Sequence, residues 1–208
     1  MTPAPAENNA MSTESAPGAA GAAVAGAEDA HRLLRAVIQG ERLTQDETGV
    51  VFAALGAGDL SEAETAALLA ALHSRGETAD EVAGAASAFR HAARPFPEVT
   101  FPLVDVVGTG GDGAGTINIS TGAGIVAASM GISVAKHGNR AVSSRTGAAD
   151  VIAALGLPLN LSPQEAVEIL ARDHFTFLFA QAYHPAMKHV APIRRALATP
   201  TIFNVLGP

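Results

Sequence analysis

Apolar residues recur every three or four positions in the first part of the chain, and this spacing predicts amphipathic helices between Glu28 and about Ala93. At three places in this stretch a hydroxyl residue stands three positions before a glutamate, which is the capping-box pattern of a helix start. These pairs are Thr44 with Glu47, Ser61 with Glu64, and Thr78 with Glu81. The first part of the chain is therefore expected to form a small helical unit.

From about residue 99 onward, short apolar runs alternate with stretches of helical spacing. Strands are expected at 103–107, 133–135 and 175–179, with a buried helix start as the alternative at 175–179, and a further apolar run at 201–205 is typical of another strand. Helices are expected at 120–130, at 148–155 and from Ser162, where Pro163 suits a first turn. This alternation predicts an α/β fold, with a small N-terminal helical domain and a larger domain that holds a mostly parallel sheet flanked by helices.

Breaks in the pattern divide the chain into three parts. Residues 1–27 are rich in Ala, Pro, Gly, Ser and Thr without an apolar period, and we expect them to form a disordered tail. Two prolines in Arg94–Glu98 end the helical pattern, which makes this segment a candidate hinge. The expected domains are a helical domain with its hinge over 28–98 and an α/β domain over 99–208.

A glycine-crowded turn follows the first expected strand, over residues 105–121. Glycines let the backbone approach a ligand closely, and the helix that opens near Asn118 adds unpaired amides and the positive end of its dipole. This pattern predicts a polyphosphate cradle, and Asp112 within it favours a divalent cation or a ribose hydroxyl beside the phosphates. Neither the P-loop pattern nor the dinucleotide fingerprint is met, and a simple tight turn is the alternative.

Two further polar clusters follow along the chain. The first, at 134–147, contains Lys136 and Asn139 and follows the next strand, so that it is expected to share one sheet edge with the glycine turn; a solvated basic loop is the alternative. The second lies at 182–195, where a helix after Pro185 would direct Arg194 toward the cleft. His184 stands in the same cluster, and no nearby carboxylate or cysteine completes a metal site there.

Composition narrows the possible classes of protein. The 208 residues are 48% hydrophobic, enough for one sizeable core or for a small and a larger domain. The cysteine count of 0 excludes a disulfide framework and a zinc–cysteine site in this sequence. The net charge of -7 argues against nucleic-acid binding, and no apolar stretch predicts a signal peptide or a membrane span. We expect a cytoplasmic enzyme.

The motifs, taken in their order along the chain, resemble those of anthranilate phosphoribosyltransferase, the tryptophan-pathway family that joins anthranilate to phosphoribosyl pyrophosphate. The resemblance runs from about residue 30 to the last one, and four motifs carry it: Gly108–Gly113, Asn118–Thr121, Lys136–Arg140 and His184–Lys188. It implies a fold like that of nucleoside phosphorylases and phosphoribosyltransferases. It also implies that helices around 162–195 pack with the helical domain, and that a homodimer forms through that domain.

The resemblance also implies the site residues and the cofactor, Mg²⁺. The phosphoribosyl pyrophosphate ligands would be Gly108, Gly110, Gly111, Asp112, Thr116, Asn118, Ser120, Thr121, Lys136 and Ser144. The anthranilate ligands would be Gly108, Asn139, His184 and Arg194. Arg194 would pair with the substrate carboxylate, and the Ser120 hydroxyl would lie near the metal ion. No residue is assigned as a nucleophile, because the reaction needs positioning and charge stabilisation rather than a proton relay.

Two departures from the family pattern accompany this resemblance. The family continues past the position of Pro208 and there supplies an Asp-Glu pair that coordinates Mg²⁺, so that the remaining metal ligands are expected beyond Pro208 and weak or absent turnover is expected for these residues alone. Pro200 stands where the family usually has an arginine. Two other functions stay open: a pyrimidine nucleoside phosphorylase-like enzyme, whose usual Lys-His-Ser-Thr-Gly motif is missing, and a non-catalytic phosphate-binding or dimerisation module.

Overall fold

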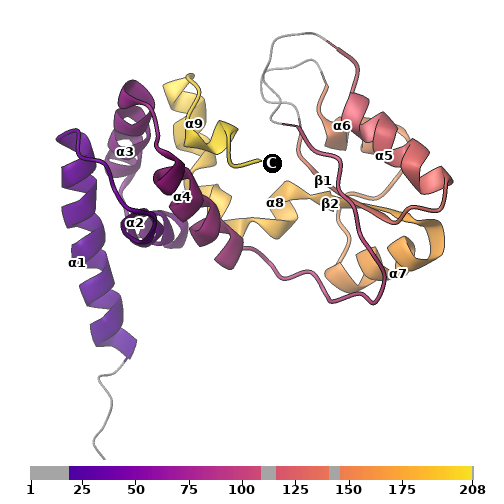
Figure 1. Cartoon of the computed structure of the whole chain (residues 1–208), viewed down its shortest axis with the longest axis horizontal. Coiled ribbons are helices and arrows are strands. Elements are labelled where there is room, and N and C mark those ends of the chain that lie inside the picture. Colours follow the sequence, from indigo (N-terminus) through magenta and orange to yellow (C-terminus); the bar gives the residue numbers. More distant parts are fainter. Residues whose placement is uncertain (1–18, 109–115, 141–145, 208) are drawn as a thin grey trace, which may run out of the picture.

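The computed structural model describes residues 19–108, 116–140 and 146–207, which form two domains placed side by side (Figure 1). The helical domain begins with four helices: α1 (Ala19–Ile38), α2 (Gln45–Ala57), α3 (Glu62–Arg75) and α4 (Ala79–His91). The α/β domain contains α5 (Ile119–Ser129), β1 (Val134–Gly138), α6 (Ala148–Ala154), α7 (Pro163–Asp173) and β2 (Phe175–Phe179). The chain then passes through α8 (Ala180–Tyr183), η1 (Pro185–His189), α9 (Ala191–Leu197) and η2 (Ile202–Asn204).

The helices α2, α3 and α4 begin where the sequence predicts, because hydrogen bonds between neighbouring residues cap their first turns. Each of the three expected capping boxes forms, with the hydroxyl accepting from the backbone of the glutamate and the glutamate accepting from the backbone of the cap. The same arrangement starts α7, where Ser162 caps the helix and Pro163 occupies the first turn. Gly58 ends α2 with a φ of 87°, a conformation that favours glycine.

The helix α1 begins earlier than expected. The sequence predicts a disordered tail through residue 27, but α1 already starts at Ala19, so this prediction is wrong for residues 19–27. The segment is rich in alanine, the residue with the highest helix propensity, which outweighs its lack of an apolar period. Residues 1–18 lie outside the part of the chain that the structure describes.

The end of the chain packs into the helical core. Val190, Ile193, Ile202 and Phe203 are buried there with the apolar residues of α1 to α4. The ring of Phe203 meets that of Phe89 edge to face at 4.9 Å, which joins η2 to α4. Within 162–195, therefore, the part after Pro185 belongs to the helical core, whereas α7 contacts β2 in the other domain.

The run 201–205 does not form the expected strand. Residues Ile202–Asn204 form the 3-10 helix η2, with the Asn204 side chain accepting from the backbone of Thr201. A short apolar run fits a buried helical turn as well as a strand, and here the aromatic contacts of Phe203 within the helical core decide between them.

The sheet of the second domain has two parallel strands among the described residues. Val134 of β1 lies opposite Phe175 of β2, and Gly138 lies opposite Phe179. The segment 103–107 was expected to be a strand, but it makes only one bridge, between Val104 and Val134, on the other side of β1. Val104 is 41% exposed, so little packing supports a longer ladder at this edge.

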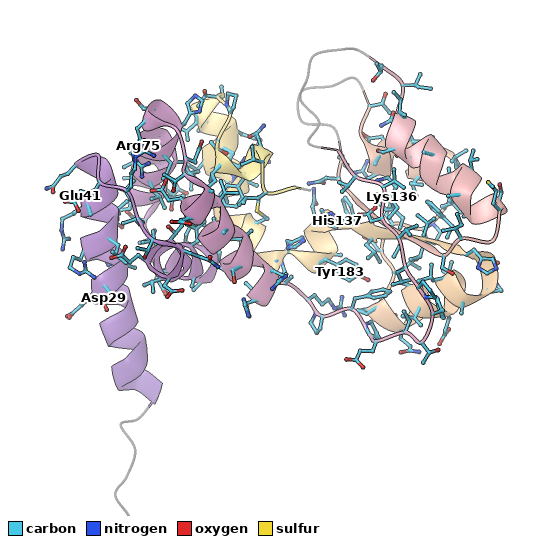
Figure 2. The ribbon with its side chains drawn as sticks, in the orientation of Figure 1. Asp29, Glu41, Arg75, Lys136, His137 and Tyr183 are labelled. Atoms are coloured by element: carbon cyan, nitrogen blue, oxygen red, sulfur yellow. The ribbon has the colours of Figure 1, made fainter. Side chains whose placement is uncertain are left out.

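Two contacts join the domains near the candidate hinge. The amide of Arg94 donates to the carbonyl of Tyr183 at 2.7 Å, and the rings of Phe96 and Tyr183 lie 6.4 Å apart. Through Tyr183, its last residue, α8 thus contacts the segment after α4, between the two domains (Figure 2). None of the helices in the described ranges is long and apolar enough to cross a membrane.

Candidate functional site

The carboxyl ends of the parallel segments meet at one edge of the sheet, which we call the carboxyl edge. Gly108 follows the bridged segment at this edge, Asn139 follows β1, and α8 follows β2 directly. A hydrogen bond links two of the loops, because the side-chain amide of Asn118 donates to the carbonyl of Thr146 at 3.1 Å. The expectation that the loops after neighbouring strands face a common site agrees with this contact.

The first turn of α5 lies at the carboxyl edge with its amides uncapped by a side chain. Asn118 occupies the N-cap position but makes no capping hydrogen bond, since its amide is directed to Thr146. Ser120 is half-buried, and Thr121 is 1% exposed with a hydroxyl that has no partner among the described residues. A helix N-terminus with open amides and nearby hydroxyls is suited to bind an anion.

Lys136 is buried behind the segment that holds Val106. Its side chain is 2% exposed, and Nζ donates to the carbonyl of Val106 at 2.7 Å and to that of His137 at 3.2 Å. Burial lowers the pKa of this ammonium, while Asp105, with Oδ1 3.9 Å away, acts in the opposite direction. The lysine therefore holds the backbone at Val106 and buries its ammonium close to that segment.

Two histidines from different parts of the chain meet at the carboxyl edge. The rings of His137 and His184 are packed edge to face, with centroids 5.2 Å apart. Burial lowers the pKa of His137, and the neighbouring His184 lowers it further. Burial also lowers the pKa of His184, against the effect of a hydrogen bond to the backbone of Phe89. Both imidazoles are therefore neutral at pH 7, and Nε2 of His137 has no partner among the described residues.

Asn139 is fixed from two sides at the end of β1. Its carbonyl accepts from the amide of Ala149 at 3.1 Å, and its side-chain Oδ1 accepts from the amide of Arg140 at 2.8 Å. The side chain of Gln181, on α8, also donates to Oδ1 at 3.4 Å. Arg140 is in turn held by an ion pair with Asp150 at 2.9 Å.

Arg194 has its contacts in the helical domain. Nη2 donates to Oδ1 of Asn204 at 3.2 Å, and the guanidinium lies 5.5 Å from the centre of the Phe203 ring. The side chain is half-buried, and this burial lowers its pKa. Its expected pairing with a substrate carboxylate stays a prediction.

Several expected ligands fall outside the described residues. These are Gly110, Gly111, Asp112 and Ser144. Gly108 and Thr116, which flank the first of these gaps, are both exposed. Among the other expected ligands, the structure places Asn118, Ser120 and Thr121 at the start of α5 and Lys136 and Asn139 in and after β1, while His184 packs on His137 of β1.

The sequence predicts that Ser120 lies near a Mg²⁺ ion, and the described residues can be compared with the ligands that this ion prefers. No group of three His, Cys, Asp or Glu side chains suited to a metal ion occurs among them. Mg²⁺ prefers oxygen ligands and is commonly bound by few protein groups together with substrate phosphates and water. The Ser120 hydroxyl has the right donor chemistry for this role, so the residues present fit a metal that is bound mainly through its substrate.

Sequence reasoning missed the residues that contact Asn118 and Asn139, two of the expected substrate-binding residues. Gln181 and the Thr146 carbonyl carry no motif signature, because their roles depend on which loops meet in space. A signal for Gln181 was available, since it stands two positions after β2 and so lies at the same edge as Asn139.

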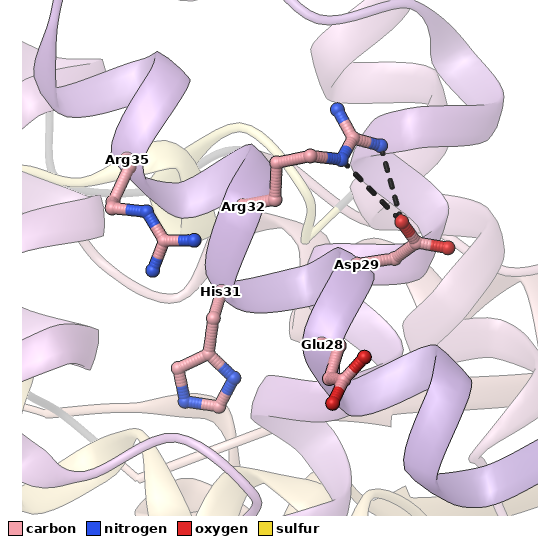
Figure 3. A pocket seen from close by; sticks show the side chains of 5 residues that line it. All are labelled: Glu28, Asp29, His31, Arg32 and Arg35. Carbon is pink, nitrogen blue, oxygen red and sulfur yellow. Dashed lines mark hydrogen bonds and ion pairs between the residues drawn. The ribbon is translucent and has the colours of Figure 1, made fainter.

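Two surface recesses lie away from the carboxyl edge, and neither contains the residues expected to bind the substrates. One lies along α1 and is lined by charged residues, shown in Figure 3. There Arg32 bonds to Asp29 at 3.3 Å, and His31 lies 3.2 Å from Glu64, so these side chains already have partners. A second recess, lined by Phe101 and His174 among others, lies at the opposite end of the strands, where β1 and β2 begin.

The family comparisons agree with the two-domain division. A family described as "Glycosyl transferase family, helical bundle domain" matches residues 31–93, and one described as "Glycosyl transferase family, a/b domain" matches residues 100–208. Anthranilate phosphoribosyltransferase from Idiomarina loihiensis is 52% identical over 177 residues, which cover 85% of this chain and 52% of that protein. The enzyme of the same name from Corynebacterium efficiens is 53% identical over 165 residues, or 79% of this chain and 48% of that protein.

Solved structures show the same similarity. Anthranilate phosphoribosyltransferase from Thermus thermophilus superposes with a TM-score of 0.79 at 50% identity, over 85% of this chain and 54% of that one. The yeast enzyme in complex with PRPP and Mg, from Saccharomyces cerevisiae, gives a TM-score of 0.78 at 29% identity, over 87% of this chain and 54% of that one. These findings confirm the resemblance that the motifs carry. The chain spans about half the length of the relatives it matches.

Proposed function

Because the chain belongs to the glycosyl transferase family, with its helical bundle and a/b domains both present, we propose that it binds phosphoribosyl pyrophosphate and anthranilate and serves phosphoribosyl transfer between them. The observation that carries this proposal is the set of contacts at the carboxyl edge, where the Asn118 side chain bonds to the Thr146 carbonyl and the ring of His184 packs on that of His137. Relatives at 50% identity or more that bear the name anthranilate phosphoribosyltransferase support the choice of substrates.

The diphosphate is assigned to the N-terminus of α5. The amides of its first turn have no acceptors within the helix, and the positive end of the helix dipole favours a multiply charged anion. The half-buried Ser120 and the buried Thr121 place hydroxyls beside these amides. Lys136 adds a buried positive charge beside Val106, in the segment that precedes the glycine turn in sequence.

The aromatic acid is assigned to the space beside Asn139 and His184. A neutral His184 ring, packed on His137, offers an apolar face to an aromatic ring without competing as a cation for the phosphates. The amide of Asn139 offers a hydrogen-bond donor to an acceptor group on the substrate. We also assign Arg194 to the substrate carboxylate, because a guanidinium matches a carboxylate with two parallel hydrogen bonds.

The proposed reaction depends on positioning and on charge. The amine of anthranilate would attack the anomeric carbon as pyrophosphate leaves, so negative charge grows on the diphosphate as the bond breaks. Fixed amides of α5 aimed at that charge stabilise the transition state, and holding both substrates at one edge removes part of the entropic barrier. Mg²⁺, when bound, supplies further neutralisation of the leaving group. The proposal includes no protein nucleophile.

The same family membership supports two further proposals, one on the cellular location of the protein and one on its oligomeric state. We assign the protein to the cytoplasm, where a biosynthetic enzyme would meet these soluble substrates. We also propose a homodimer formed through the helical domain, whose surface exposes apolar side chains such as Ile38 and Val50.

Calorimetric titration with phosphoribosyl pyrophosphate, with and without Mg²⁺, tests the proposed function. We expect binding that strengthens with Mg²⁺, and we expect Ser120→Ala to weaken it about three- to tenfold, the net effect of one hydrogen bond to a charged group. Ser129→Ala is the matched control, because Ser129 lies at the other end of α5 and bonds to Val126. Equal affinities for both variants and the wild type would contradict the assignment.

Competition experiments separate this proposal from its alternatives. Anthranilate should compete with a fluorinated anthranilate probe, and uracil or thymine should not. Displacement by uracil would favour a pyrimidine nucleoside phosphorylase-like enzyme. Binding of the sugar diphosphate with no response to either aromatic compound would favour a phosphate-binding module.

A further inference from the structure

The side chain of Gln181 contacts that of Asn139 at the carboxyl edge. An asparagine amide has one accepting and two donating groups, and rotation of the amide by half a turn exchanges them. At this position two donors, the amide of Arg140 at 2.8 Å and Nε2 of Gln181 at 3.4 Å, both point to Oδ1. The backbone N–H of Arg140 can only donate, so the exchanged orientation would set the NH₂ group against it; Oδ1 is held there, Nε2 of Gln181 is the second donor to it, and Nδ2 faces away from both.

The backbone places these two residues together with little freedom. The carbonyl of Asn139 is tied to α6 through the amide of Ala149 at 3.1 Å. Gly138 and Phe179 are paired across β1 and β2, and α8 starts at the residue after Phe179. The strand register therefore brings Gln181 beside Asn139 although 42 positions separate them in sequence.

The consequence is a hydrogen-bond donor at the edge that has no acceptor among the described residues. Asn139 is exposed, and every described contact of its side chain is made by Oδ1. A donor fixed in this way favours ligands with an acceptor, such as a carboxylate, at this point and disfavours ligands with an amine there. Gln181 itself is exposed, so this contact rather than core packing is its structural contribution.

We propose that Gln181 is a positioning residue for substrate selection: it orients Asn139 so that its amide donates to the carboxylate of the aromatic acid. This inference rests on the proposed function, since it takes anthranilate as the ligand of Asn139. Gln181 does not itself touch the reacting atoms, and its effect passes through one side chain. Its loss should therefore act on affinity for the aromatic acid and leave the affinity for the sugar diphosphate unchanged.

Two variants test the role of the donor. Gln181→Met keeps the length of the side chain and removes the donor, whereas Gln181→Glu replaces the donor with acceptors that attract the NH₂ group of Asn139. We expect anthranilate affinity, measured by calorimetry with Mg²⁺ and phosphoribosyl pyrophosphate present, to fall about three- to tenfold in Gln181→Met and further in Gln181→Glu. Gln164→Met, at an exposed glutamine on α7, is the matched control and should bind like the wild type.

A double-mutant cycle and a spectroscopic readout exclude a merely structural effect. In an Asn139→Ala background, Gln181→Met should have no further effect on affinity. The ¹³Cγ resonance of Asn139, which responds to donors on Oδ1, should move in Gln181→Met and stay in place in Gln164→Met. An unmoved resonance, or wild-type anthranilate affinity in Gln181→Met, would overturn the inference.

Anthranilate binding by the wild type shows whether the proposed function or only the positioning role of Gln181 has failed. If the wild type binds anthranilate and Gln181→Met binds it equally well, the positioning role is wrong and the proposed function stands. If the wild type does not bind anthranilate, the proposed function fails, and the substrate-selecting role of Gln181 fails with it even where the ¹³Cγ resonance moves.

Discussion

Glu81 should make the helical domain sensitive to acid. Its carboxylate is 0% exposed and accepts from the amides of Leu43 at 3.0 Å and Thr78 at 2.9 Å and from the guanidinium of Arg75. Burial raises the pKa of this carboxyl, but the hydrogen bonds and the charge of Arg75 outweigh burial and lower the pKa from 4.5 to about 2. The group thus joins the loop before α2 to the loop between α3 and α4 (Figure 2 labels Arg75).

The lowered pKa sets both the sign and the size of the effect. The carboxylate stabilises the folded state fully above the unfolded-state pKa, and this contribution is lost as the pH falls from about 5 toward about 2. The difference between the two pKa values corresponds to about 3 kcal/mol of folding free energy. Glu81→Gln should cost a similar amount, about 3 kcal/mol at pH 7, because it leaves the mostly buried Arg75 without its counter-charge.

Urea unfolding, measured from pH 7 down to about 3, checks this prediction. The stability difference between the wild type and Glu81→Gln should shrink as the pH falls, since the wild-type carboxylate then takes up a proton. Glu62→Gln, at an exposed glutamate on α3, is the control and should change stability by no more than about 0.5 kcal/mol. A pH-independent difference, or a loss in Glu81→Gln no larger than in the control, would refute the reasoning.

Three further predictions concern other parts of the molecule. Gly84→Ala should lower the unfolding free energy by at least about 1–3 kcal/mol in a urea titration, because a Cβ there would lie 2.3 Å from the carbonyl oxygen of Gln45, and unchanged stability would contradict this packing. His137 should titrate below 6.5 in an NMR pH series, with unfolding favoured as the pH falls through this range, since burial disfavours its charged form; a pKa above 6.5 would contradict that environment. Asn118→Ala should weaken phosphoribosyl pyrophosphate binding about three- to tenfold by calorimetry, because it releases the loop held at Thr146; unchanged affinity would show that this bridge is dispensable.

The sequence predicts best those features that local chemistry determines. The capping boxes at Thr44, Ser61 and Thr78 form because hydroxyl and glutamate lie close enough to bond within one turn. The strand at Phe175–Phe179 and the helix from Ser162 also follow from nearby residues. Motif order supplies the candidate site, since strands that run in parallel bring their following loops to one edge.

Features that depend on distant contacts were not predictable in the same way. The run at 201–205 is apolar enough for a strand, and only the aromatic partners of Phe203 in the helical core make it a 3-10 turn. The sequence likewise does not show that the ammonium of Lys136 bonds to the carbonyl of Val106, 30 positions away; its role as a ligand stays a prediction. The partner of a long side chain is set by tertiary structure, which a single sequence does not display.

The amide resonances of the ¹⁵N-labelled protein, followed during titration with phosphoribosyl pyrophosphate and Mg²⁺, test the central claim most directly. The account predicts saturable shifts concentrated at the first turn of α5 and at Lys136–Asn139, with α1 and the recess at Phe101 unchanged. Shifts confined to those other surfaces, or none at millimolar ligand, would contradict the assignment of the sugar diphosphate to the carboxyl edge.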